Sequence, residues 1–175
     1  SRAVLPAMRA ARNGQIFNVS SQLGRVVIPG FGQYSSTKFA LEAMSEQMAY
    51  ELVQHGVDIT IIQPGGYPTN IWSNANKYSA PLKDRTEADR PESDPALTAG
   101  MGERTAGGGT TDPMDVPKAI AQTMALSQGK RPLRLPLHPG RKPQLGINEV
   151  STKTQVAMLG NSPFGPWIKD VNERS

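Results

Sequence analysis

The sequence contains no cysteine and only two histidines among its 175 residues. Without cysteine the chain can form neither a disulfide framework nor a thiolate metal site. His55 and His138 stand apart from other ligand types, so we expect no metal site. No apolar run approaches the roughly 18 residues that a membrane helix needs. These absences disfavour disulfide-rich, metal-dependent and membrane-spanning proteins, and they fit a cytoplasmic location.

The chain also lacks a strong charge bias, because 19 basic and 15 acidic residues leave a net charge of +4. A basic cluster does lie between residues 130 and 142, and the ordinary interpretation is a solvated surface. A nucleic-acid-binding module is the alternative, and its binding would depend steeply on salt. Because such surfaces are usually more concentrated and more strongly basic, we expect no nucleic-acid partner. The cluster consists of Lys130, Arg131, Arg134, Arg141 and Lys142.

Hydrophobic periodicity predicts an α/β fold in the first part of the chain. We expect the end of a helix over 2–12, a strand over 15–20, a long helix over 34–55 and a β-branched strand over 58–63. Strand, helix and strand with short joints form a βαβ unit, so the two strands should be parallel with a right-handed crossover.

The second part of the chain is less regular. Residues 73–112 are rich in Pro, Gly, Thr and charge, which predicts an irregular loop, either disordered or a candidate lid over a ligand. A capped helix is expected from Asp112 to about Gly129, a short strand over 133–137 and a weaker helix over 144–159. We expect one domain over residues 1–175, because the chain is too short for two.

Tyr34 and Lys38 lie four residues apart at the start of the long helix, so their side chains share one face. An ammonium beside a phenol favours the ionised phenol, which suits a general acid or base. The pair alone is common enough to arise by chance. Ser21, however, ends a predicted strand thirteen residues earlier, and ligands bind outside the carboxyl ends of parallel strands. A hydroxyl, a phenol and a cation in one crevice suit a carbonyl oxygen that gains negative charge.

These motifs together resemble the short-chain dehydrogenase/reductase family, and its simple-dehydrogenase branch in particular. The resemblance rests on Asn-Val-Ser-Ser at 18–21, Tyr-x-x-x-Lys at 34–38, the Ser-to-Tyr spacing and the Pro-Gly turn after the next strand. It implies the carboxy-terminal part of a doubly wound, parallel-sheet Rossmann-type fold. It also implies hydride transfer between NAD or NADP and an alcohol or carbonyl.

By this resemblance Tyr34 is the general acid/base and Ser21 binds the substrate oxygen. Lys38 favours the phenolate and holds the nicotinamide ribose. The remaining cofactor-binding positions implied by the family are Asn18, Ser20, Pro64, Gly65, Tyr67 and Thr69.

The family's glycine-rich dinucleotide fingerprint is absent from the sequence. We therefore expect a chain truncated at its amino end, an incomplete NAD(P)-binding domain that is inactive alone. Apolar residues flanking the site favour a hydrophobic alcohol or carbonyl substrate, and the family favours a homo-oligomer for the full-length protein. A non-catalytic, cofactor-binding regulatory or scaffold protein is the alternative. The flanking residues are Val27, Ile28, Phe31, Tyr67, Ile71 and Trp72, while Phe39, Leu41 and Met48 are expected in the core.

Overall fold

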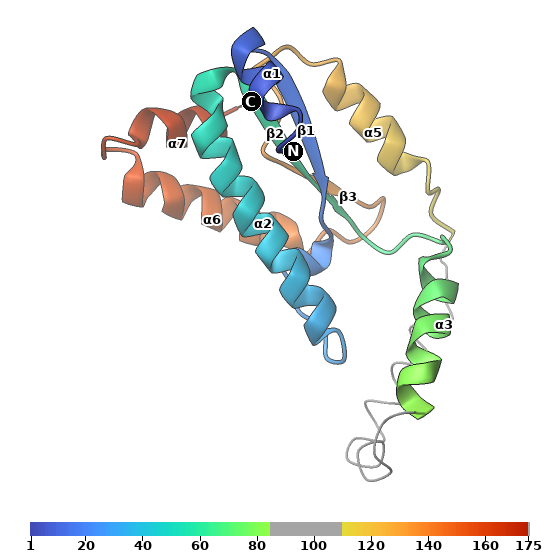
Figure 1. The fold of residues 1–175 in the computed structure, drawn as a ribbon. Coiled ribbons are helices and arrows are strands. Elements are labelled where there is room, and N and C mark those ends of the chain that lie inside the picture. The colour runs from blue at the N-terminus through green and yellow to red at the C-terminus, as the bar shows by residue number, and fades with distance from the viewer. Residues whose placement is uncertain (85–109, 175) are drawn as a thin grey trace.

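A computed structural model describes residues 1–84 and 110–174, and it has α/β architecture (Figure 1). Three parallel strands form one sheet in the order β1-β2-β3, with β2 in the centre. The elements are α1 (Leu5–Ala11), β1 (Gly14–Val19), η1 (Gln22–Gly24), α2 (Gly32–Leu52), η2 (Val53–His55), β2 (Val57–Pro64), α3 (Ile71–Asp84), α5 (Asp115–Met124), β3 (Arg134–Leu137), α6 (Gln144–Leu159) and α7 (Gly165–Asn172).

The βαβ prediction for the first part of the chain is confirmed. Strand β1 pairs with β2 in parallel, from Gly14 opposite Val57 to Val19 opposite Ile62. The left-handed conformation of Gly56, with φ of 69°, ends the α2–η2 segment, and β2 begins at the next residue. This position needs glycine because other residues adopt that backbone conformation only at a cost.

Helices cover both faces of the sheet, as a doubly wound fold requires. The Asn18 side-chain amide of β1 donates to Ser45 Oγ on α2 at 2.9 Å. The Gln15 amide, which points to the opposite face, donates to the Met124 carbonyl of α5 at 3.2 Å. This alternation follows from the two-residue period of a strand.

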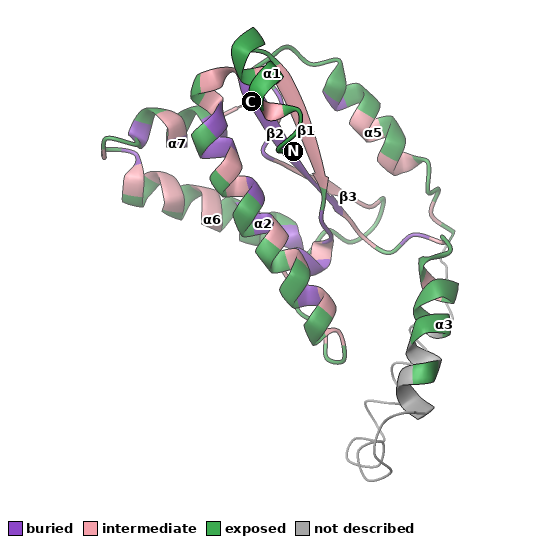
Figure 2. Ribbon diagram, viewed as in Figure 1, coloured by how far each residue is buried: buried purple, intermediate pink, exposed green. Residues whose placement is uncertain are grey.

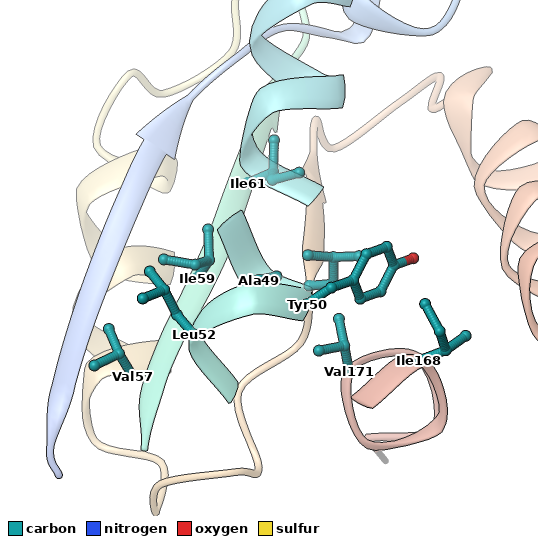
Figure 3. Packing of buried hydrophobic residues seen from close by; sticks show 9 residues of the cluster. Ala49, Tyr50, Leu52, Val57, Ile59, Ile61, Ile168 and Val171 are labelled. Atoms are coloured by element: carbon teal, nitrogen blue, oxygen red, sulfur yellow. The ribbon is translucent and has the colours of Figure 1, made fainter. Parts of the chain in front are cut away.

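The core lies between β2, α2 and α7 (Figure 3). Ile59 and Ile61 of β2 are almost fully buried, and Figure 2 shows the central strand as buried over most of its length. Burying one such side chain contributes roughly 1.5–3 kcal/mol. The α2 and α7 side chains of this core are Ala49, Tyr50, Leu52, Ile168 and Val171. Phe39, expected in the core, is 41% exposed, so that prediction is wrong.

Two predictions about the second part of the chain need correction. The prediction of an irregular loop over 73–112 is wrong for residues 73–84, which belong to α3. The prediction of a lid depends on residues 85–109, which lie outside the described residues. The basic cluster is not a continuous exposed surface. Arg131 pairs with Asp58, and Arg134 pairs with Glu42, all with side chains at most 8% exposed.

Within residues 1–84 and 110–174, no helix combines the length and apolar character that crossing a bilayer requires.

Candidate active site

The fold brings Ser21, Tyr34 and Lys38 together at the carboxyl edge of the sheet. Ser21 follows β1 and precedes η1, while Tyr34 and Lys38 lie in the first two turns of α2. The Pro64-Gly65 turn ends β2 at the same edge. All three side chains line one cavity of about 440 Å³, called here the polar cavity.

A second cavity of about 660 Å³, called here the aromatic cavity, adjoins the first. Leu23, Phe31 and Trp72 contribute to its wall, and no charged side chain belongs to the described residues that line it. Ser21 and Tyr34 line both cavities, whereas Lys38 lines only the polar one. The two hydroxyls therefore lie where the two cavities meet, and among the described lining residues only the polar cavity has a charged side chain, Lys38. The lining shared by both cavities is Ser21, Tyr34, Gly65, Gly66, Ile71 and Trp72.

The Lys38 ammonium lies beside the Tyr34 ring, with Nζ 5.6 Å from the ring centroid. The same Nζ donates to the Val19 carbonyl at the end of β1, at 3.0 Å. Burial lowers the pKa of Lys38, because removal from water disfavours the charged form. Tyr34 therefore lies at the amino-terminal end of α2 and next to an ammonium group.

The Ser21 hydroxyl is oriented by its own turn. Its Oγ accepts a hydrogen bond of 3.1 Å from the Leu23 N–H at the start of η1, and the residue is 8% exposed. Because that bond uses only an oxygen lone pair, the hydroxyl hydrogen is left to donate to another oxygen.

The turn after β2 forms the wall opposite α2. The Tyr67 carbonyl accepts hydrogen bonds from the Trp72 indole at 2.9 Å and from the Thr69 N–H at 3.0 Å. The Tyr67 N–H has no acceptor among the described residues. Burial, followed by the charges of Asp115 and Asp112, raises the pKa of the Tyr67 phenol.

Most of the predicted cofactor-binding positions line the polar cavity, but Asn18 does not. Ser20, Pro64, Gly65, Tyr67 and Thr69 belong to the lining together with Tyr34 and Lys38. The Asn18 side chain bonds to Ser45 instead, because the alternation of β1 turns it toward α2.

The apolar residues expected around the site divide in a similar way. Phe31, Ile71 and Trp72 line the aromatic cavity, and Tyr67 lines the polar cavity. Val27 is 66% exposed and lines neither cavity, and Ile28 also lies outside both linings.

Sequence reasoning missed the contribution of α5 and β3. Pro113, Val116 and Pro117 complete the polar cavity. His138, just after β3, packs its ring against Tyr67 with centroids 5.7 Å apart. A Cβ on Gly65 would come within 2.7 Å of the His138 ring, so this turn position needs glycine. No local sequence motif identifies these residues, because they reach the turn after β2 only through the tertiary structure.

Comparison with known proteins agrees with this geometry. A family model described as short chain dehydrogenase matches residues 1–80. The chain is 33% identical over 144 residues to the uncharacterized oxidoreductase YusZ of Bacillus subtilis (strain 168), covering 81% of this chain and 49% of that protein. It is 30% identical over 141 residues to the oxidoreductase BOA17 of Botryotinia fuckeliana (strain B05.10), covering 79% and 48% respectively.

The structure also resembles the crystal structure of a short-chain dehydrogenase from Streptomyces avermitilis, at 27% identity. The TM-score is 0.61 over 90% of this chain and 53% of that one. The chain belongs to the short-chain dehydrogenase/reductase family. It spans about half the length of the curated relatives it matches.

As a short-chain dehydrogenase/reductase, the chain has a Rossmann-like α/β fold with a parallel sheet. The matched residues 1–80 contain the Ser21, Tyr34 and Lys38 arrangement and the Pro64-Gly65 turn.

Proposed function

We propose that this chain forms the catalytic part of an oxidoreductase that transfers a hydride between NAD or NADP and an alcohol or carbonyl group. The observation that carries the proposal is the shared lining: Ser21 and Tyr34 face both cavities, and Lys38 faces only the polar one. In this assignment the polar cavity holds the nicotinamide and the aromatic cavity holds the substrate, so the reacting carbonyl lies at the junction.

The donors around the polar cavity fit a nicotinamide nucleoside. Lys38 Nζ bonds to one carbonyl, Val19 O, and so has further N–H groups for ribose hydroxyls. The unpaired N–H of Tyr67 and the hydroxyl of Thr69 fit the carboxamide. The carbonyl of Tyr67 is already occupied by Trp72 and Thr69, so we assign the carboxamide contact to the N–H. When bound, the cofactor would supply or take up the hydride.

The proton is assigned to Tyr34. In carbonyl reduction its hydroxyl donates a proton to the substrate oxygen, and in alcohol oxidation its phenolate takes the proton back. Ser21 donates a hydrogen bond to the same oxygen, and Lys38, whose Nζ lies 5.6 Å from the Tyr34 ring centroid, stabilises the phenolate. Such preorganised donors and charges stabilise the oxygen as it becomes negative.

The aromatic cavity supports a neutral, largely apolar substrate. Leu23, Phe31, Ile71 and Trp72 surround the space beside Tyr34, and the described lining offers no charge to pair with a carboxylate or phosphate. An unpaired anion would lose its hydration without compensation there. Homo-oligomerisation and a cytoplasmic location stay predictions.

Because the glycine-rich fingerprint is absent from these 175 residues, we propose that the chain by itself binds a dinucleotide weakly and turns over little substrate. The test therefore uses the full-length protein that contains this chain.

The experiment is a panel of apolar aldehydes, ketones and alcohols, assayed with a cofactor deuterated at nicotinamide C4. We expect deuterium to reach the carbonyl carbon of the product, as read by mass spectrometry. Saturable cofactor binding without turnover on any member of the panel would favour the non-catalytic alternative instead. If the protein neither bound the cofactor nor turned over any member of the panel, the proposal would be overturned.

A further inference from the structure

Gln63 is a polar residue in β2, the most buried of the three strands that the structure describes. It follows Ile61 and Ile62 in β2, directly precedes the Pro64-Gly65 turn, and is 0% exposed. A buried amide destabilises a core unless its hydrogen-bonding groups are paired. Its presence so close to the site therefore calls for a set of partners.

The partners of Gln63 come from two helices. Its Nε2 donates to Glu42 Oε1 of α2 at 2.9 Å, and its Oε1 accepts from Asn148 Nδ2 of α6 at 2.8 Å. Its backbone carbonyl accepts from Gln144 Nε2, also of α6, at 3.2 Å. All four residues are buried, so water does not compete for these bonds.

Glu42 connects Gln63 to the reacting groups. It lies four residues beyond Lys38 and eight beyond Tyr34, so all three share one face of α2. Its second oxygen, Oε2, accepts from Arg134 Nε of β3 at 3.0 Å. Glu42 is thus held at both oxygens, which fixes the rotation of α2 about its axis against the end of β2.

We propose that Gln63 is a positioning residue that sets the distance between α2, with Tyr34 and Lys38, and the Pro64-Gly65 turn across the polar cavity. This inference rests on the proposed function. An apolar side chain in β2 could pack against α2, but it would not define a register between the helix and the turn as the directional hydrogen bond to Glu42 does, while the bond from Asn148 of α6 orients the Gln63 amide for it.

The test compares Gln63→Met with Thr60→Val in the full-length protein. Methionine keeps the length of glutamine and removes both side-chain hydrogen bonds. Thr60 is a matched control, because it is also buried in β2 but its hydroxyl bonds to the Pro132 carbonyl, at 2.9 Å, and not to a side chain of α2. We expect Gln63→Met to raise the KM for the nicotinamide cofactor about tenfold, because a small misplacement of a binding wall is costly.

A purely structural role would lower the melting temperature without changing the KM of the folded enzyme. We expect this behaviour from Thr60→Val. If Gln63→Met folds poorly, Asn148→Leu removes only one of the two bonds and should move the cofactor KM in the same direction by a smaller factor. If Gln63→Met folds and its cofactor KM is unchanged, this inference is overturned. If Gln63→Met does not fold, an unchanged cofactor KM in Asn148→Leu overturns it. In that case the proposed function would still be supported if the wild-type protein turned over a substrate with deuterium transfer.

Discussion

Removing Asp58 should strongly destabilise the protein, because this buried carboxylate pairs with two buried guanidinium groups. Asp58 is the second residue of β2, and it accepts from Arg131 Nη1 and Arg174 Nη1, each at 2.7 Å. The Gly129 N–H donates to it as well, at 3.0 Å. The side chains of Asp58, Arg131 and Arg174 are only 3%, 8% and 6% exposed, so water can do little to replace a lost partner.

The magnitude follows from what Asp58→Ala leaves behind. Two guanidinium groups would be buried next to each other without their shared carboxylate. Breaking a buried pair by removing one partner costs about 3–5 kcal/mol, and here one carboxylate serves two partners. We expect a loss near the upper end of that range. Arg174→Met should cost less, about 2 kcal/mol, because Asp58 keeps Arg131 and Gly129.

Urea titration of the full-length protein measures these losses directly. Asp170→Asn is the matched control, since Asp170 also faces Arg174, at 3.6 Å, but its side chain is 54% exposed. We expect that control to change the free energy of unfolding by less than about 1 kcal/mol. Asp58 lies at the end of β2 opposite the site, so kcat per folded molecule should be unchanged. If Asp58→Ala were as stable as Asp170→Asn, the reasoning about buried charge would be refuted.

Two further predictions concern acid stability and the cavity wall. Burial alone would raise the pKa of Glu46, but the charge and hydrogen bond of Arg134, the hydrogen bond of Tyr50 and the charge of Arg25 together lower the pKa below 4.5. The stability that Glu46 contributes is therefore present above pH 4.5 and is lost as the pH falls toward the lower pKa that Glu46 has in the folded protein. Glu46→Gln should flatten this part of the curve when the free energy of unfolding is measured against pH. Trp72→Phe keeps an aromatic wall but removes the indole bond to the Tyr67 carbonyl. We expect the KM for cofactor to rise by about three- to tenfold, and an unchanged value would argue against the turn's role.

The main elements could be predicted because their patterns are local. The β-branched run of β2 is visible in a few residues, and the structure confirms this strand and the long helix α2. The buried face of α2 was not predicted, because Glu42 and Ser45 are buried on it while Phe39 and Met44 are exposed. The sequence does not predict helix α7, because it is only eight residues long and begins with Gly165-Pro166, a pair typical of turns. The composition of α3 favours a loop, since its sequence is rich in Asn, Ser and Lys and contains Pro81.

The part of the candidate site that the sequence could predict is the part whose residues lie close together along the chain. Tyr34 and Lys38 are one helical turn apart, so their proximity follows from α2 alone. The direction of the Asn18 side chain depends on which face of β1 meets α2, and in the structure it points to Ser45 and lines neither cavity. Arg131 looked like part of a basic surface because its partner, Asp58, lies 73 residues away. Contacts between residues so far apart in the sequence depend on the tertiary structure and cannot be inferred from spacing along the chain.

The most direct test of the central claim is the turnover of Tyr34→Phe in the full-length protein. The variant keeps the ring beside Lys38 and removes the hydroxyl assigned to proton transfer. We predict that kcat falls by about 10²–10⁴ while cofactor affinity stays near the wild-type value. Tyr78→Phe, which changes a 70% exposed tyrosine outside both cavities, should behave as wild type. A Tyr34→Phe enzyme with wild-type kcat would contradict the account.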